Sequence, residues 1–214
     1  MQRALVLGNG ESRASLNLEL FRNSHTILGC NALHRDFLVD HLICCDQRMV
    51  REALENQDYK TIPIWVREDW YNFFRKIQKN KNIRQLPDLP YSGKNRADES
   101  RNWGSGPYAI LTALSLGHTA IDLVGFDLWG IGKRVNNLYK GTKNYSGRES
   151  SAIDPSYWIY QISKLISLNP NIEFNFINRQ EWDLPAEWRT NNVKKTNITI
   201  DRSVNTLYNL QIED

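Results

Sequence analysis

The chain has 214 residues and a mass of 24.9 kDa, which predicts one domain or a domain with an appendage. Its 41% hydrophobic and 24% charged residues are typical of a globular protein and exclude wholesale disorder. The net charge of +3 comes from 27 basic and 24 acidic residues, a balance that argues against a nucleic-acid-binding protein. Seven Trp and nine Tyr are an excess that indicates a flat ligand.

The three cysteines are Cys30, Cys44 and Cys45. Their odd number and the lack of a Cys-x-x-Cys pair argue against disulfides and a structural zinc site, so we expect buried thiols in a reducing compartment. No stretch approaches the roughly 20 apolar residues of a membrane span, and the apolar start is short for a signal peptide. A cytoplasmic protein is therefore expected.

Short β-rich apolar runs alternate with amphipathic stretches, a pattern typical of a mostly parallel sheet flanked by helices. The predicted fold class is therefore α/β, with a single Rossmann-like domain. Strands are expected over residues 4–7, 26–30, 41–45, 62–66, 120–125 and 172–177. Helices are expected over residues 15–21, 47–55, 69–79, 107–116 and 155–168, the last two beginning at prolines.

Two irregular segments interrupt this alternation. Residues 88–103 are expected to form a long loop, and residues 128–153 are too long for a simple connection, which predicts a lid. The nucleotide-binding domain is assigned to residues 1–190 and a C-terminal extension to residues 191–214. The β-like stretch 196–200 within the extension suits an edge strand, an oligomer contact or a loose tail.

A glycine-rich turn, Gly8-Asn9-Gly10-Glu11-Ser12, directly follows the first predicted strand. Glycines there let the backbone turn sharply and approach a ligand, although the turn also suits a purely structural role. A dinucleotide fingerprint is disfavoured, because Arg13 takes the third glycine position and the second strand ends in Asn31 instead of an acidic residue. Gly8, Asn9, Gly10 and Ser12 are thus candidate ligand contacts.

Polar side chains follow three successive predicted strands: Asn9, Asn31 and Asp46. Because carboxyl ends of parallel strands line one crevice, these side chains are expected to converge on a polar ligand. Each taken alone is better explained as a turn or cap residue, and it is the coincidence of three that favours a binding site.

Gly104-Ser105-Gly106 opens a predicted apolar helix, where free N–H groups suit an anion or the polar edge of a base. A capped helix without a ligand is the alternative. Asp127 ends the next strand and suits either a sugar hydroxyl or a cap. An ATP-binding P-loop is excluded, since Gly93-Lys94 is followed by Asn95 and lacks the earlier glycine.

The predicted lid has five basic residues and no acidic residue between positions 133 and 148. The basic residues are Lys133, Arg134, Lys140, Lys143 and Arg148. Together with Tyr139 and Tyr145, they predict a loop that closes over phosphates, the alternative being a charged surface loop. No Asp-x-Asp pair, metal-spaced histidine pair or Gly-x-Ser-x-Gly elbow occurs, so no metal site or serine hydrolase is expected.

Four motifs resemble those of the bacterial sialyltransferases of glycosyltransferase family 42, over roughly residues 3–180. They are Gly8-Asn9-Gly10-Glu11-Ser12, Cys30-Asn31, Gly104-Ser105-Gly106 and Gly125-Phe126-Asp127-Leu128. The resemblance implies a Rossmann-like domain with a lid that transfers sialic acid, without a metal and with inversion, from CMP-sialic acid to a sugar acceptor. It also implies nucleotide contacts from Asn9, Gly10, Asn31, Ser105 and Asp127. Tyr139 and Tyr145 correspond to lid tyrosines that face the phosphate.

The chain departs from this family at the catalytic base. The family places a histidine between lid and last helix, but residues 144–154 contain none. Glu149 or Asp154 is the replacement, which makes Tyr139, Tyr145 and Glu149 the catalytic candidates and adds Lys143 to the binding residues. The expected partners are a nucleotide sugar and a sugar acceptor, with no separate cofactor and no nucleic acid. A homo-oligomer remains open.

Two alternatives remain. A weaker resemblance links the start of the chain to 6-hydroxymethylpterin pyrophosphokinase-like domains, in which proline stands where this chain has Glu11. It implies a phosphotransferase that needs magnesium and ATP. The missing histidine favours a non-catalytic nucleotide-binding module instead.

Overall fold

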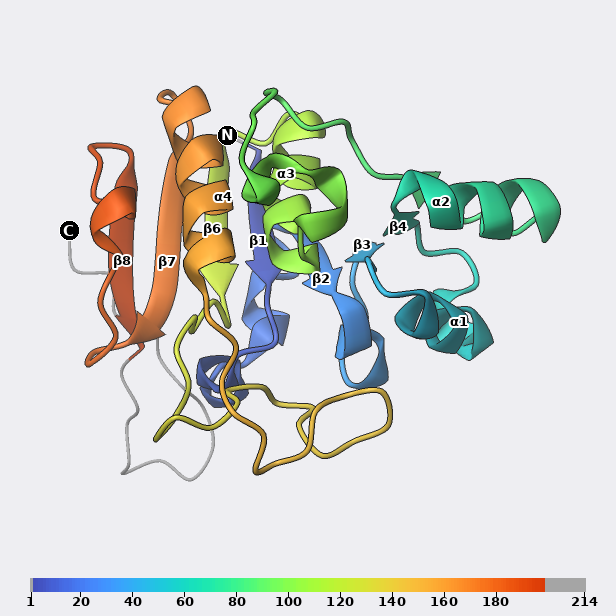
Figure 1. The fold of residues 1–214 in the computed structure, drawn as a ribbon, viewed down its shortest axis with the longest axis horizontal. Coiled ribbons are helices and arrows are strands. Elements are labelled where there is room, and N and C mark those ends of the chain that lie inside the picture. Colours follow the sequence, from blue (N-terminus) through green and yellow to red (C-terminus); the bar gives the residue numbers. More distant parts are fainter. Residues whose placement is uncertain (1, 199–214) are drawn as a thin grey trace.

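The computed structural model describes residues 2–198, which form one parallel β-sheet covered by helices (Figure 1). Eight strands lie in the order β5-β4-β3-β2-β1-β6-β7-β8, and every neighbouring pair is parallel. The predicted α/β fold with a Rossmann-like sheet is confirmed. In chain order the strands are β1 (Arg3–Leu7), β2 (Thr26–Cys30), β3 (His41–Ile43), β4 (Ile64–Val66), β5 (Ile83–Gln85), β6 (Ala120–Val124), β7 (Glu173–Arg179) and β8 (Val193–Ile198).

Four α-helices connect these strands: α1 (Gln47–Glu55), α2 (Glu68–Tyr71), α3 (Ser105–Ser115) and α4 (Ser156–Leu168). The chain continues from α2 into π-helical turns, Asn72–Ile77. The single helix predicted over residues 15–21 is wrong. Two 3₁₀ turns, Glu11–Ser15 and Leu18–Phe21, replace it, because the Asn17 side chain accepts a hydrogen bond from the Glu19 N–H and starts a new turn.

The two prolines lie close to the predicted helix starts, but neither takes the first helical position. Pro107 is the third residue of α3, whose cap is Gly104, and Pro155 directly precedes α4. Proline is tolerated in a first turn because N–H groups there have no partner within the helix.

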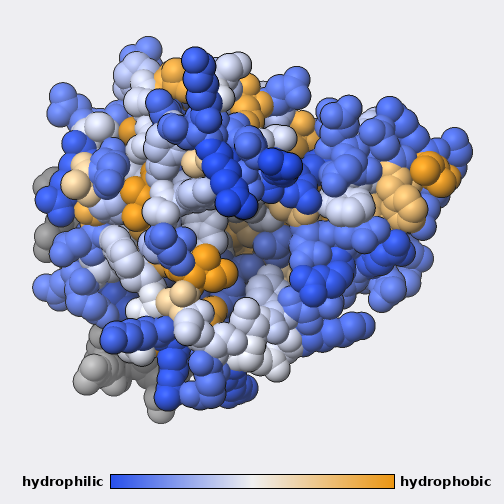
Figure 2. Space-filling view, in the orientation of Figure 1, coloured by the Kyte–Doolittle hydropathy of each residue, from blue (hydrophilic) through white to orange (hydrophobic). Residues whose placement is uncertain are grey.

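The central strands β1, β2 and β6 are buried on both faces, which explains why their sequences are nearly continuous apolar runs. Ala4 and Val6 of β1 belong to the core under α3 and α4, whereas Leu5 and Leu7 belong to the core on the opposite face. Figure 1 shows α3 and α4 side by side over the first of these faces. The surface seen in Figure 2 is mainly hydrophilic, with hydrophobic residues in separate groups.

The strand order reverses at β1, and this reversal locates the crevice in which an open α/β sheet binds its ligand. Strands β1 to β5 follow each other in one direction, and β6 to β8 extend the sheet on the other side of β1. The loops that leave β1 and β6 therefore diverge, and ligands in open α/β sheets bind at such a switch point. Residues 128–153 contain no helix or strand, and they run past the carboxyl ends of the strands (Figure 1).

The predicted C-terminal extension begins inside the sheet. β8 pairs with β7 along its whole length, so this part of the extension is an edge strand. Residues 199 and 200 of the predicted β-like stretch lie outside the described residues, and the domain boundary at residue 190 stays a prediction.

The cysteines are free, as predicted, with Cys30 and Cys44 buried and Cys45 partly buried. Among the described residues, no helix is both long and apolar enough to cross a membrane.

A buried charge network stabilises the amino-terminal edge of the sheet. The Asp122 carboxylate accepts hydrogen bonds from Arg3 at 2.8 Å, His25 at 2.8 Å and Asn175 at 2.7 Å. Burial raises the pKa of Asp122, but these hydrogen bonds outweigh it, and the pKa lies below its usual value.

Because that pKa is lower in the folded than in the unfolded chain, Asp122 stabilises the fold above about pH 4, the unfolded value. The stabilisation is lost as the pH falls through the lower folded value. Asp122→Asn should lower the free energy of unfolding by about 3 kcal/mol at pH 7. In this variant the free energy of unfolding should also decrease less steeply as the pH is lowered. Urea denaturation at pH 7 and at lower pH measures both, with Asp154→Asn, at an exposed carboxylate, as control. An unchanged acid dependence in Asp122→Asn would contradict this role.

Candidate functional site

Two glycines bring the loops after β1 and β6 into contact. The Gly8 N–H donates to the Val124 carbonyl at 2.8 Å, and the Gly10 N–H donates to the Gly125 carbonyl at 2.9 Å. Gly125 has a φ of +74°, and a Cβ on Gly8 would lie 2.4 Å from the Gly125 oxygen. Only glycine fits this crossing, so the motif predicted as a ligand turn also closes the switch point.

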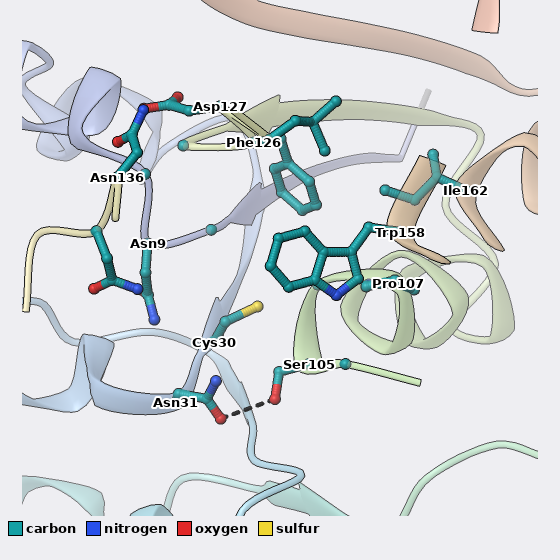
Figure 3. A pocket seen from close by; sticks show the side chains of 17 residues that line it. Asn9, Cys30, Asn31, Ser105, Pro107, Phe126, Asp127, Asn136, Trp158 and Ile162 are labelled. Carbon is teal, nitrogen blue, oxygen red and sulfur yellow. Dashed lines mark hydrogen bonds between the residues drawn. The ribbon is translucent and has the colours of Figure 1, made fainter. Parts of the chain in front are cut away.

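A cavity of about 240 Å³ opens at this crossing (Figure 3). It brings together most of the predicted binding residues, since Gly8, Asn9, Gly10, Asn31, Gly104, Ser105, Gly106 and Asp127 line it. Other lining residues were not predicted as binding residues: Cys30, Pro107, Gly125, Phe126, Leu128, Asn136, Asn137, Trp158 and Ile162.

Asn31 and Ser105 form one polar side of the cavity. The Ser105 hydroxyl donates to the Asn31 side-chain oxygen at 2.8 Å and accepts from the Cys45 N–H at 3.1 Å. In Figure 3 the Asn31 amide nitrogen points away from this bond toward the cavity. Asn31 has a φ of 50°, a left-handed conformation that asparagine adopts more readily than most residues. The pair therefore presents a fixed hydrogen-bond donor to a ligand.

The amino terminus of α3 borders the same side. Its cap, Gly104, provides no side-chain hydrogen bond, so the first N–H groups of this eleven-residue helix have no capping side chain. Unpaired N–H groups and the helix dipole favour an anion at this end. An added Cβ on Gly104 would lie 3.1 Å from the Trp158 ring nitrogen, so glycine also lets the indole of α4 come close.

The opposite side is apolar and aromatic. Phe126, Trp158, Ile162 and Cys30 face the cavity in Figure 3. Burial raises the pKa of the Cys30 thiol, which therefore remains a neutral, apolar wall group. An aromatic wall opposite a polar one suits a flat heterocycle with a charged substituent. The excess of tryptophan was the sequence signal for this wall, but no pattern assigned it to Trp158.

Asn9 and Tyr145 connect the cavity to the long loop. The Asn9 side-chain nitrogen donates to the Tyr145 hydroxyl at 3.1 Å, and the Ala32 N–H donates to it at 3.3 Å. Burial raises the pKa of Tyr145, so its hydroxyl keeps a proton that it can donate. The Asn9 side-chain oxygen is buried and has no partner among the described residues, which leaves one acceptor for a ligand.

Asp127 is placed by hydrogen bonds of its own. Its carboxylate accepts from the Ser12 N–H at 2.9 Å, from the Ser12 hydroxyl and from the Asn178 amide at 3.3 Å. Asp127 therefore caps the 3₁₀ turn Glu11–Ser15 and also lines the cavity, so the capping role and the cavity position both hold. Ser12 is buried and does not line the cavity.

The other predicted site residues lie elsewhere. Asp46 caps α1 and pairs with Arg48 at 2.7 Å, and Glu149 is exposed and pairs with Arg134 at 3.0 Å. Lys143 is exposed and does not line the cavity, and Asp154 accepts from the Ser156 N–H before α4. The catalytic role of Glu149 and the binding roles of Asp46 and Lys143 therefore have no geometric support here.

Tyr139 has a different environment from Tyr145. It is buried, and its hydroxyl donates to Asp36 at 2.5 Å and accepts from Arg13 at 2.8 Å. Neither tyrosine lines the cavity itself, but Tyr145 contacts the lining residue Asn9, whereas Tyr139 contacts no lining residue through its hydroxyl. These bonds join the long loop to the turns after β1 and β2. Tyr139 thus holds the loop in place.

The two tyrosines give a paired prediction. Tyr139→Phe should lower the free energy of unfolding by about 1–2 kcal/mol and leave the affinity of the cavity for its ligand unchanged. Tyr145→Phe should lower that affinity roughly 10-fold, because the hydroxyl proton available to a ligand is lost, and should also cost about 1 kcal/mol of stability, because Asn9 and the Ala32 N–H lose an acceptor. Urea denaturation and calorimetry separate the effects, and the reverse assignment would refute both roles.

The comparisons with known proteins concern the fold. No family model and no curated protein sequence matches the chain. The solved structure of the sialyltransferase CstII from Campylobacter jejuni, in complex with the substrate analogue cytidine-5'-monophosphate, has a TM-score of 0.55 and 14% identity. That similarity covers 89% of this chain and 88% of CstII.

A mutant of α-2,3/8-sialyltransferase CstII gives a TM-score of 0.50 at 16% identity, covering 82% of this chain and 81% of that one. The weaker resemblance to pterin pyrophosphokinases gains no support from these structures. The chain has the α/β fold of the CstII sialyltransferases, the fold that the resemblance to glycosyltransferase family 42 implies.

Proposed function

We propose that this protein is a glycosyltransferase that takes its sugar from a CMP-sugar donor bound in the cavity between β1 and β6. The observation that carries the proposal is the cavity itself, which combines an uncapped α3 terminus and the Asn31 amide with an aromatic wall. The phosphate suits the α3 end, and the base suits the wall of Phe126 and Trp158. CstII, which shares the fold, was crystallised with cytidine-5'-monophosphate.

The proposed reaction is a direct displacement. The acceptor hydroxyl attacks the anomeric carbon, the bond from that carbon to the phosphate oxygen breaks, and CMP leaves with the bonding electrons. The Tyr145 hydroxyl donates a hydrogen bond to the departing phosphate, which stabilises its developing charge. We propose that the chain requires no metal for this step.

Asp127 takes the acceptor proton in this proposal. Among the residues that the structure describes, Asp127 is the acidic side chain that lines the cavity, and none of the lining residues is a histidine. The Asp127 carboxylate is oriented by Ser12 and Asn178, which fix its position as a base requires.

Release of CMP tests the proposal. The full chain, incubated with CMP-sialic acid and a panel of saccharide acceptors, should release CMP and form a new glycosidic bond in the presence of EDTA. Asp127→Asn should slow release at least 100-fold while CMP binding persists. Binding of CMP without release from any donor would instead support the second candidate, a nucleotide-binding module, which the absence of a histidine in the wall favours.

A further inference from the structure

The chain between β4 and the end of β5 forms an arm that extends from one edge of the sheet (Figure 1). We call residues 68–85 the α2 arm, because they comprise α2, the π-helical turns and β5. The Trp70 ring nitrogen donates to the Cys45 carbonyl at 3.2 Å, and Phe74 is buried in the core. The Asn82 amide donates to two backbone carbonyls between α1 and β4. The outer end of the arm thus projects from a fixed base.

The α2 arm has an unbalanced positive charge. Between positions 70 and 87 the sequence has five basic residues and no acidic one, although the net charge of the whole chain is only +3. The two acidic residues of the arm, Glu68 and Asp69, lie in the first turn of α2, away from its outer end. Four of the basic residues are exposed, and none of the five forms an ion pair among the described residues. The five are Arg75, Lys76, Lys79, Lys81 and Arg84.

An exposed apolar side chain lies among these cations. Ile77 is 70% exposed, the largest fraction among the exposed large hydrophobic residues that the structure describes. Figure 2 shows hydrophobic surface at the outer end of α2, bordered by hydrophilic residues. Tyr71 and Phe73 are partly exposed, and the Lys76 ammonium lies 5.8 Å from the centre of the Tyr71 ring. Apolar and aromatic side chains next to lysines are typical of segments that lie in a membrane interface.

The backbone at the outer end of the arm supports a role for its charge. Lys79 lies between the helical segment and β5 and has a φ of 61°, a left-handed conformation that glycine or asparagine adopts more readily than lysine. A lysine there costs folding free energy, and its exposed side chain places a cation where the chain turns back. Local strain of this kind is typical of positions with a binding role.

Charge and apolar surface together narrow the class of partner. A cluster of lysines and arginines attracts any polyanion, a nucleic acid or an anionic lipid surface included. A phosphate backbone would leave Ile77 in water, whereas the interface of a bilayer accepts an apolar side chain and the surrounding cations together. The combination therefore favours lipid over nucleic acid.

We propose that the α2 arm docks the protein on the surface of a bilayer that contains anionic lipids. Ile77 enters the head-group region, and the lysines lie against the lipid phosphates. No residue of the arm lines the cavity between β1 and β6, so docking leaves that cavity open. The inference is independent of the proposed transfer reaction.

Vesicle sedimentation with the full chain tests the proposal. The protein should sediment with vesicles of equal parts phosphatidylglycerol and phosphatidylcholine, and bind phosphatidylcholine vesicles about 10-fold more weakly or less. Lys76→Gln/Lys81→Gln should weaken binding to the anionic vesicles roughly 20-fold, since each cation contributes a factor of about five. Ile77→Gln should weaken it about 5-fold, because a polar side chain does not enter the interface.

Matched controls remove the same groups elsewhere. Lys94→Gln/Arg96→Gln removes two exposed cations from a loop beside α4, where Asn95 donates to the Tyr160 hydroxyl. Leu20→Gln removes an apolar side chain that is 56% exposed. Both controls should bind the anionic vesicles like the unchanged protein.

Lys79→Gly separates docking from folding. The substitution removes one cation and also relieves the left-handed backbone, so its midpoint in urea denaturation should not fall. Its binding to the anionic vesicles should nevertheless be about 5-fold weaker. A loss of binding in this variant therefore does not come from unfolding.

Four results would overturn the assignment of the arm. They are no sedimentation with anionic vesicles, equal binding to both kinds of vesicle, unchanged binding by the arm variants, and an equal loss in the matched controls. Tight binding of a duplex oligonucleotide that Ile77→Gln leaves intact, without vesicle binding, would assign the arm to a nucleic acid instead. The donor cavity is tested separately by CMP binding, which the arm variants should leave unchanged.

Discussion

Replacing Gly125 by alanine is expected to lower the free energy of unfolding by about 3 kcal/mol, one of the largest losses of any single substitution at the site. A side chain at a φ of +74° costs about 1–2 kcal/mol. Its Cβ would also lie 2.8 Å from the Gly8 oxygen, so β1 and β6 have to separate, which adds about 1–3 kcal/mol. Urea denaturation followed by circular dichroism measures the loss.

Gly117 provides the matched control. It has a φ of +84°, yet an added Cβ would meet nothing within 4 Å. Gly117→Ala should therefore cost about 1 kcal/mol, the backbone contribution alone. Equal losses in the two variants would show that the crossing of the β1 and β6 loops is not tightly packed.

A charge at position 31 should nearly abolish nucleotide binding. Asn31→Asp keeps the size of the side chain but places a carboxylate beside the α3 terminus, where the phosphate is proposed to bind. Two like charges about 5 Å apart in a partly buried site repel by roughly 3 kcal/mol, so the affinity for CMP should fall roughly 100-fold. Calorimetry with the full chain measures this change.

Cytidine is the control ligand for this prediction. It has the base and ribose of CMP but no phosphate, so it does not feel the repulsion between the carboxylate introduced by Asn31→Asp and the phosphate. Its affinity should change less than 5-fold in Asn31→Asp if the loss is electrostatic. Asp46→Asn, at a predicted site residue that the structure places outside the cavity, should bind CMP like the unchanged protein. If CMP and cytidine lose affinity equally, the phosphate does not lie near Asn31.

The centre of the site could be predicted from the sequence, because polar residues that follow parallel strands meet at one edge of the sheet. Apolar runs located β1, β2 and β6, and in a parallel sheet the residues that follow such strands meet at one edge. Asn9, Asn31 and Asp127 do so. Asp46 follows β3 in the same way, but its carboxylate binds the N–H of Arg48 in its own helix. A cap and a ligand contact look alike in sequence, because both need a short polar side chain at that point.

The long loop was harder to predict because its contacts are not local. Tyr139 and Tyr145 are six positions apart and equally plausible as ligand contacts, yet one binds Asp36 and the other Asn9. The basic residues of the loop predict a phosphate lid, whereas Lys140 pairs with Glu11 and Arg134 with Glu149. Strand β5 was missed for another reason. Its sequence, Ile-Arg-Gln, has one buried apolar residue and two exposed polar ones, so it lacks the apolar run that identified the equally short β3 and β4.

The most direct test of the account is calorimetric titration of the full chain with CMP, UDP and GDP in buffer containing EDTA. We expect one site for CMP with a Kd below about 1 mM, weaker binding of the other two nucleotides, and loss of the CMP signal in Asn31→Asp. Absence of binding by all three nucleotides would contradict it, as would a CMP signal that Asn31→Asp leaves intact.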